Sequence, residues 1–104
     1  MMTEKIPVSI LGATGTVGQK FVRLLAAHPW FEIASVAASA QSAGKRYGDI
    51  VRWRESTPLP GRVAAMTIQA AEPGIPGRIA FSAIEADIAG QVEQAFARAG
   101  AYVE

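Results

Sequence analysis

A glycine-rich segment directly after a short apolar run restricts the fold more than any other feature of this 104-residue chain. The apolar run, Ile6–Leu11, has the length and composition of a buried strand. The segment that follows, Gly12–Gly18, reads GATGTVG and has the spacing GxxGxxG. The residues that then fall on one helix face are Val17, Phe21, Leu24, Leu25 and His28. The order of strand, glycine turn and helix is typical of a nucleotide-binding unit.

Such a turn can bind a phosphate group, because free N–H groups and the positive end of the helix dipole point at the anion. In this interpretation Gly12 allows the tight turn and Gly15 lets the backbone approach a pyrophosphate. Gly18 lets the helix pack close to the strand. We therefore predict dinucleotide binding. The alternative is a glycine-rich turn that serves packing alone.

Strand-like and helix-like patterns alternate along the rest of the chain, which predicts βαβ units and a parallel sheet. The predicted strands are Pro7–Leu11, Glu32–Ala38, Ala64–Ala70, Arg78–Ser82 and Ala101–Val103, and the predicted helices are Gly15–Ala27 and Glu85–Ala99. A long connection, Ser39–Arg62, is expected to be functional or to carry short structure of its own. The predicted fold is α/β, a Rossmann-type doubly wound parallel sheet in one small domain. Its strand order would be 3-2-1-4-5, with the ligand between strands one and four.

Composition and charge exclude several classes of function. The chain has no cysteine, which excludes disulfides, thiolate metal sites and a cysteine nucleophile within it. Its only histidine, His28, precedes Pro29 and is expected to interact with the last carbonyls of the first helix. A net charge of +1 gives no reason to expect a nucleic-acid partner. No apolar run reaches the roughly 18 residues of a membrane span, and no signal peptide is visible, so a soluble cytoplasmic protein is expected.

The residues after the second predicted strand indicate which nucleotide binds. An NAD-binding unit usually has Asp or Glu about 20 residues after the glycines, where it holds the ribose 2′-hydroxyl. Here the segment Ser39–Arg46 reads SAQSAGKR and contains no carboxylate. A 2′-phosphate needs donors and positive charge, which Ser39, Ser42 and Lys45 can supply. NADP is therefore predicted rather than NAD. The alternative is a solvated loop in which Lys45 is only a surface charge.

With these residues in place, the chain resembles the N-terminal part of the aspartate-semialdehyde dehydrogenases, in their archaeal and fungal branch. The resemblance covers nearly the whole chain and rests on four stretches: Ile10–Gln19, Ala37–Tyr47, the region of Trp53, and Phe81–Asp87. It implies the following cofactor contacts: Thr14, Gly15, Thr16 and Val17 on the phosphates, Ser39 and Ser42 on the 2′-phosphate, and Ser82 and Ala83 along the cofactor near strand four. Gln41 stands where the family often has Arg, and a guanidinium would grip a phosphate better, so selectivity for NADP is expected to be lower.

The family's reaction, reductive dephosphorylation of aspartyl phosphate to the semialdehyde, needs a thiolate and a base. Family members continue after the fifth strand with a Ser-Asn stretch, a substrate domain, a catalytic Cys and a later His, none of which stands in these 104 residues. The expectation is an NADP-binding domain, incomplete relative to the family and not catalytic by itself. Whether it is a naturally short protein or an isolated domain stays open. The alternative is a non-catalytic sensor or regulatory protein that reads NADP.

A homo-oligomer is also expected. In the larger family fold the last strand would pair within a wider sheet, and a second domain would cover part of this one. An uncovered strand edge and apolar surface favour self-association.

Overall fold

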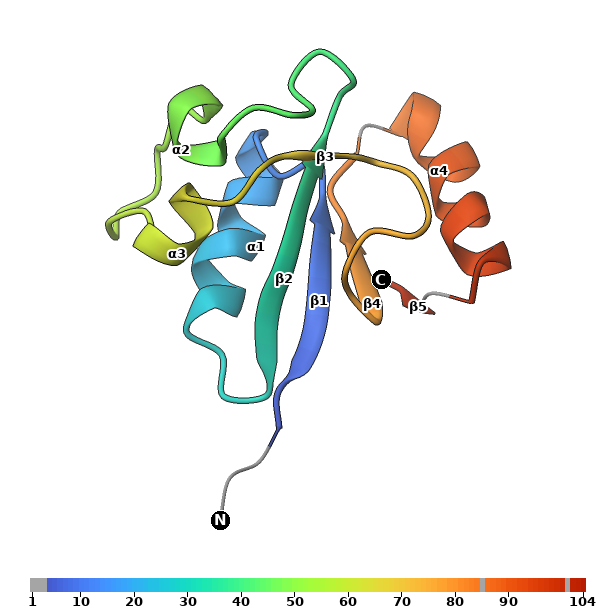
Figure 1. Cartoon of the computed structure of the whole chain (residues 1–104), viewed down its shortest axis with the longest axis horizontal. Coiled ribbons are helices and arrows are strands. Elements are labelled where there is room, and N and C mark those ends of the chain that lie inside the picture. The colour runs from blue at the N-terminus through green and yellow to red at the C-terminus, as the bar shows by residue number, and fades with distance from the viewer. Residues whose placement is uncertain (1–3, 85, 101) are drawn as a thin grey trace.

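The structure is a computed structural model that describes residues 4–84, 86–100 and 102–104 (Figure 1). Its elements in chain order are β1 (Ile6–Leu11), α1 (Thr16–Ala26), β2 (Phe31–Ala38), α2 (Tyr47–Ile50), α3 (Gly61–Ala64), β3 (Gln69–Ala70), β4 (Ile79–Ser82), α4 (Ala86–Arg98) and β5 (Tyr102–Val103). The strands form one parallel sheet in the order β3-β2-β1-β4-β5. The predicted fold class and strand order are confirmed.

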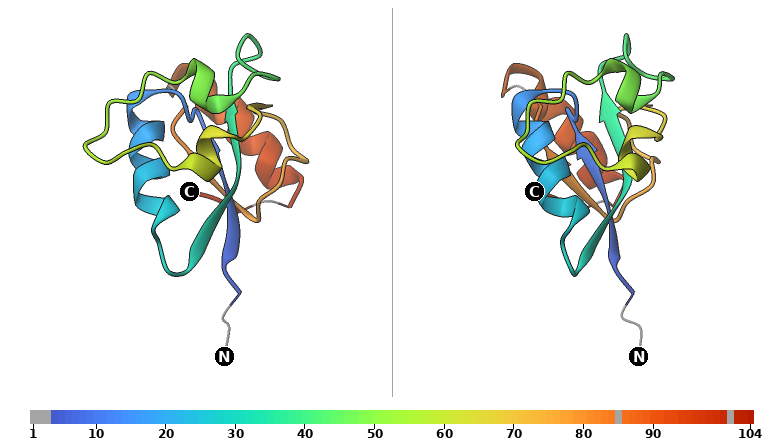
Figure 2. Two further views of the ribbon diagram at one scale, coloured as in Figure 1. Left: turned by 60° about the vertical axis from the view of Figure 1, so that its left-hand side comes forward. Right: turned by 90° about the vertical axis from the view of Figure 1, so that its left-hand side faces the viewer.

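The helices cover the two faces of this sheet separately. The helices α1, α2 and α3 lie on one face and α4 lies on the other (Figure 1). Two further views show the same separation (Figure 2). The central strand, β1, pairs with β2 on one side and β4 on the other, with Leu11 opposite both Ala37 and Ser82. The carboxyl ends of these three strands therefore meet at one edge of the sheet, where the strand order reverses and where open α/β sheets bind ligands.

Each face of the sheet has its own buried apolar cluster. The cluster under α1–α3 contains Val8, Ile10, Val22, Ile33, Val36, Tyr47, Val63 and Ile68 among its members. The cluster under α4 contains Leu11, Ala37, Ala80 and Phe96. Strands that are covered on both faces bury almost every side chain, which explains why β1 and β2 read as nearly continuous apolar runs.

The predicted apolar face of α1 is correct for Leu25, which is buried, and for Phe21, which packs against the core, but wrong for Val17 and Leu24. The helix buries Gly18, Val22 and Leu25, which lie at i, i+4 and i+7. In contrast, Val17 and Leu24 are 55% and 56% exposed. The physical reason is the close approach of Gly18 to the turn before the helix, which rotates that side of α1 toward the sheet.

The predicted third strand is shorter than expected. Only Gln69–Ala70 pairs with β2, and the predicted first residue, Ala64, ends helix α3 instead. The amide of Ala64 donates to the carbonyl of Pro60, and alanine favours helix over strand. The long connection does carry structure of its own, since it contains α2 and α3. Two further predicted positions, Glu85 and Ala101, lie outside the described residues.

Two helix ends behave differently from each other. At the end of α4, Gly100 has a φ of +92°, as expected of a glycine just after a helix. The Nδ1 atom of His28 accepts a hydrogen bond from the amide of Trp30 at 3.1 Å, so this side chain supports the following turn instead of the last carbonyls of α1.

Within the described part of the chain, no helix is long and apolar enough to cross a membrane.

Candidate functional site

The turn between β1 and α1 is tight at its first residue. The amides of Gly12 and Ala13 both donate to the carbonyl of Ala37, at 2.9 and 3.0 Å. Gly12 has a φ of +74°, which side chains disfavour. A Cβ atom on Gly12 would also lie 2.8 Å from the carbonyl oxygen of Ala83. Both the conformation and the space therefore require glycine here, as the sequence predicted.

The other two motif glycines have different surroundings. A Cβ atom on Gly18 would lie 2.1 Å from the carbonyl oxygen of Gly12, so packing of the helix against the turn requires glycine. A Cβ atom on Gly15 would approach that same oxygen only to 3.6 Å, an ordinary contact. The protein's own packing therefore gives no reason for glycine at position 15.

The start of α1 is open to an anion. Gly15 is the N-cap residue and adds no side chain over the first amides of the helix. The first turn carries no acidic residue, so no carboxylate there competes for those amides. Thr16 and Val17, which begin the helix, are both exposed, and Thr14 is half-buried. This arrangement places the predicted phosphate-binding residues at a helix N-terminus that a phosphate could reach.

A hollow of about 340 Å³ lies against this turn. Its lining combines predicted and unpredicted residues: Thr14, Gly15, Thr16, Gln19, Ile50, Arg52 and Arg54. Arg52 and Arg54 come from the connection between β2 and β3. In the sequence this pair has no visible relation to the glycine turn.

Gln19 joins the glycine turn to the arginine-bearing segment. It is only 4% exposed. Its Nε2 atom donates to the carbonyls of Thr14 and Arg52, both at 3.0 Å, and its Oε1 atom accepts the amide of Arg54 at 2.9 Å. Sequence reasoning missed this residue, because its partners in the connection lie 33 and 35 residues away.

An ion pair fixes the same segment to α1 one residue further on. The Nε atom of Arg23 donates to Glu55 at 2.6 Å. Lys20 lies 4.0 Å from the other oxygen of that carboxylate. The side chain of Glu55 is only 9% exposed, and these two cations of α1 balance its charge. The segment that carries the two arginines is therefore attached to α1 in two ways. Its main chain is bonded at Arg52 and Arg54, and the side chain of Glu55 is paired with Arg23.

Behind the turn, Tyr47 occupies the core. It is completely buried, and its hydroxyl donates to the carbonyl of Ala13 at 2.6 Å. Burial raises the pKa of Tyr47 above its ordinary value, because the charged phenolate would lose its hydration. The group is thus a neutral hydrogen-bond donor that supports the turn.

The predicted 2′-phosphate residues follow the carboxyl end of β2. The amides of Ser42 and Ala43 both donate to the carbonyl of Ser39, at 2.9 and 3.0 Å, and so form a compact turn. Ser39 and Lys45 are exposed, and Ser42 is half-buried. Since Ala37 receives the glycine-turn amides, this second turn begins at the same edge of the sheet.

The predicted residues after β4 complete that edge. The amide of Ala83 donates to the carbonyl of Leu11 at 2.8 Å, which places Ala83 beside the glycine turn. The hydroxyl oxygen of Ser82 is buried and has no hydrogen-bond partner among the described residues. A buried hydroxyl without a partner is unusual in a folded protein, and a bound ligand can supply the missing bond.

The known proteins that this chain matches agree with the geometry. The sequence family described as "Semialdehyde dehydrogenase, NAD binding domain" matches residues 7–103. The chain belongs to this family. Its curated relatives include aspartate-semialdehyde dehydrogenases of the fungus Cryptococcus neoformans and of Archaeoglobus fulgidus, each 46% identical. These alignments cover 88% and 89% of this chain but only 26% and 27% of the two relatives. This chain thus spans about a quarter of the length of these relatives.

Solved structures support the same assignment. The aspartate-semialdehyde dehydrogenase of Candida albicans, solved with NADP, superposes on the domain with a TM-score of 0.90 at 39% identity. It covers 96% of this chain, which corresponds to 29% of that structure. An aspartate-semialdehyde dehydrogenase II from Vibrio cholerae, at 22% identity and a TM-score of 0.63, shares the fold. The resemblance that the sequence motifs indicated is confirmed.

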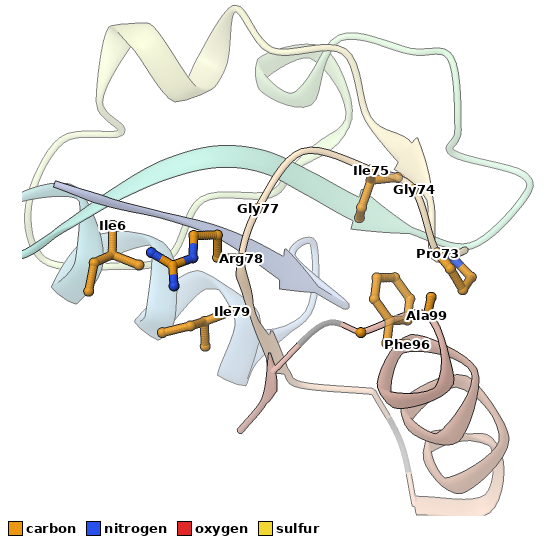
Figure 3. Close-up of a pocket in the computed structure, with 10 residues that line it drawn as sticks. Ile6, Pro73, Gly74, Ile75, Gly77, Arg78, Ile79, Phe96 and Ala99 are labelled. Atoms are coloured by element: carbon orange, nitrogen blue, oxygen red, sulfur yellow. The ribbon is translucent and has the colours of Figure 1, made fainter. Parts of the chain in front are cut away.

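A larger hollow of this NAD-binding domain, about 520 Å³, lies away from the glycine turn (Figure 3). It is lined by the start of β1 and β4, the end of α4 and the loop before β4: Ile6, Pro73, Gly74, Ile75, Gly77, Arg78, Ile79, Phe96, Ala99 and Gly100. None of the predicted cofactor residues lines it. Among the described residues, no group of three or more His, Cys, Asp or Glu side chains could hold a metal ion.

Proposed function

We propose that this domain binds NADP(H), with the cofactor phosphates on the Gly12–Gly18 turn. The observation that carries the proposal is the open position of Gly15. The fold itself requires glycine at positions 12 and 18, whereas space at position 15 is needed only if something from outside the chain occupies it. A pyrophosphate at the start of α1 explains that space. The structure of the Candida albicans relative with NADP supports the same proposal.

Each part of the dinucleotide has candidate partners at the carboxyl edge of the sheet. The residues proposed for the phosphates are Gly12, Thr14, Gly15, Thr16, Val17 and Gly18. The side chains proposed for the 2′-phosphate are Ser39, Ser42 and Lys45. Ser82, with its unpaired hydroxyl, and Ala83 are proposed to line the cofactor where it passes β4.

The preference for NADP over NAD rests on charge. The Ser39–Arg46 segment contains no carboxylate that would repel a 2′-phosphate. The nearest following acid, Asp49, already pairs with Arg46 at 3.1 Å. Two hydroxyls and the cation of Lys45 stay available on the exposed side of the turn. Gln41 is exposed there too, and as an amide it adds less selectivity than a guanidinium would.

We further propose that the domain is the cofactor-binding part of a cytoplasmic oxidoreductase that converts aspartyl phosphate to aspartate semialdehyde in amino-acid biosynthesis. Bound NADPH would supply the hydride. The domain has no cysteine, and its single histidine packs against Phe31 with ring centroids 4.8 Å apart and the ring planes tilted by 44°. The role left to its own residues is to bind and orient the cofactor. The thiolate and base would have to come from elsewhere, so this chain is proposed to be non-catalytic by itself.

Isothermal titration calorimetry on the purified chain tests the proposal. NADP should bind measurably and more tightly than NAD, with one site per chain. Adenosine, which lacks every phosphate, should bind far more weakly than either. If neither dinucleotide produces heat of binding while the chain is folded by circular dichroism, the proposal is wrong.

A further inference from the structure

We infer that Arg52 and Arg54 bind the pyrophosphate of the bound dinucleotide from the side of the hollow opposite the glycine turn, and that Gln19 is the residue that positions them. The inference rests on the proposed function and adds a cationic side to the site. The glycine turn alone offers amides and a helix dipole. Both arginines line the same hollow of about 340 Å³ as Thr14, Gly15 and Thr16.

The two guanidinium groups are available for a ligand. Both residues are exposed, and neither forms an ion pair with a carboxylate of the described residues. The nearest acid in the sequence, Glu55, is already paired with Arg23 at 2.6 Å. Two unpaired cations beside a helix start without acidic residues make this corner of the molecule favourable for an anion with more than one charge.

The segment is built to hold these cations in place. Gln19 bonds the main chain of both arginine residues, to the carbonyl of Arg52 and the amide of Arg54, and bonds the carbonyl of Thr14 as well. Between the arginines, Trp53 packs against the core, and its indole nitrogen donates to the carbonyl of Thr57 at 2.6 Å. The backbone of the arginine pair is therefore anchored on both the turn and the core, while both arginine residues are exposed and line the hollow.

The position of the pair favours the pyrophosphate over the 2′-phosphate. The hollow that the arginines line includes the glycine turn and none of Ser39, Ser42 or Lys45. A pyrophosphate is common to NAD and NADP, whereas a 2′-phosphate belongs to NADP alone. The two cofactors therefore distinguish the two targets directly.

The test compares the double variant Arg52→Gln/Arg54→Gln with the control Arg78→Gln/Arg98→Gln, which removes the same charge at exposed positions outside the hollow. We expect the first variant to bind NADP and NAD each about tenfold more weakly, since charge-assisted hydrogen bonds are lost. The control should bind both like the unchanged chain. Thermal unfolding of all variants should stay similar, because the four side chains are exposed.

A third variant, Gln19→Ala, tests the positioning role. It should weaken binding in the unchanged chain but have little further effect when both arginines are already Gln, since it acts through them. If Gln19→Ala reduced cofactor affinity by the same factor in the unchanged chain and in the double arginine variant, the positioning role would be overturned. A residue with a merely structural role would weaken binding equally in both proteins.

The remaining outcomes separate this inference from the proposed function. If the arginine variant lost affinity for NADP alone, the pair would contact the 2′-phosphate and the inference would be wrong. Unchanged affinity for both cofactors would also overturn it, while leaving NADP binding intact. If the unchanged chain bound neither cofactor, both the proposed function and this inference would fall.

Discussion

The hydroxyl of Tyr47 donates a 2.6 Å hydrogen bond to the carbonyl of Ala13, a residue 34 positions earlier in the chain. Tyr47 belongs to α2, in the connection between β2 and β3, and is completely buried. The same connection reaches the front of the glycine turn through Arg52 and Gln19. It therefore supports the turn from behind and encloses it in front, which gives this long segment a structural reason for its length.

Replacing Tyr47 with Phe should lower the free energy of unfolding by about 1–2 kcal/mol, because a buried hydrogen bond is lost and the carbonyl of Ala13 loses its donor. Urea unfolding followed by circular dichroism measures this change. Trp30→Phe, at a position that is 67% exposed, is the control and should change stability by less than about 0.5 kcal/mol. Equal stability of Tyr47→Phe and the unchanged chain would show that water replaces the bond at no cost.

Substitutions at Gly15 and Gly18 should have opposite consequences. Gly15→Val should keep the fold, since its φ of −80° and ψ of 175° suit any residue, yet should abolish nucleotide binding. Gly18→Ala should destabilise the protein by about 2 kcal/mol or more, because the new methyl group would meet backbone atoms of Gly12 and Ala13. Calorimetry and thermal unfolding on both variants measure the two effects. Native affinity in Gly15→Val would leave the turn as a packing device only.

The variant Ser39→Asp should reverse the cofactor preference from NADP toward NAD. The new carboxylate would repel a 2′-phosphate and could accept a hydrogen bond from the ribose 2′-hydroxyl. Each charge-assisted bond lost from the 2′-phosphate should cost about 1.5–3 kcal/mol of NADP binding. The ratio of the two dissociation constants is the measurement, with Ser56→Asp, on an exposed position elsewhere in the connection, as control. An unchanged ratio in Ser39→Asp would place the 2′-phosphate away from this turn.

The purified chain should not turn over aspartate semialdehyde. It has no cysteine to form an acyl intermediate. Its histidine follows α1 at the end away from the glycine turn, roughly 16 Å of helix from the proposed pyrophosphate position. Reduction of NADP in the presence of aspartate semialdehyde and phosphate is followed by absorbance. A rate that scales with protein concentration would refute the prediction.

Self-association is expected at high micromolar concentration, and sedimentation velocity measures it. The structure offers two surfaces: the edge strand β5, only two residues long, and the exposed apolar positions Val17 and Leu24, two turns apart on α1. Short edges pair weakly, so the helix face is the stronger candidate. A dimer that persists after removal of residues 101–104 and disappears in Leu24→Lys would use that face. Monomer alone at every concentration would contradict the expectation.

Much of the fold follows from local patterns. Apolar runs predicted β1, β2 and β4 almost to the residue, and the parallel order followed from the alternation of strands and helices. The third strand was overestimated because the run Ala64–Ala70 contains residues compatible with helix as well as strand. In α1 the periodicity identified the helix and the inward-facing Phe21 and Leu25, but it also included Val17 and Leu24, which are as apolar and yet exposed.

The candidate site, like the fold, has one part that the sequence predicts and another that it does not. The sequence by itself determined the strand, glycine turn and helix, because the backbone geometry there depends on residues within a few positions of one another. Only the tertiary structure decided that Gln19, Arg52 and Arg54 meet at that turn, since their hydrogen bonds span 33 and 35 residues. It also showed that packing requires Gly12 and Gly18 but not Gly15. The physical reason is that a contact between segments far apart in the sequence depends on how the helices pack against the sheet. The local spacing of residues does not determine that packing.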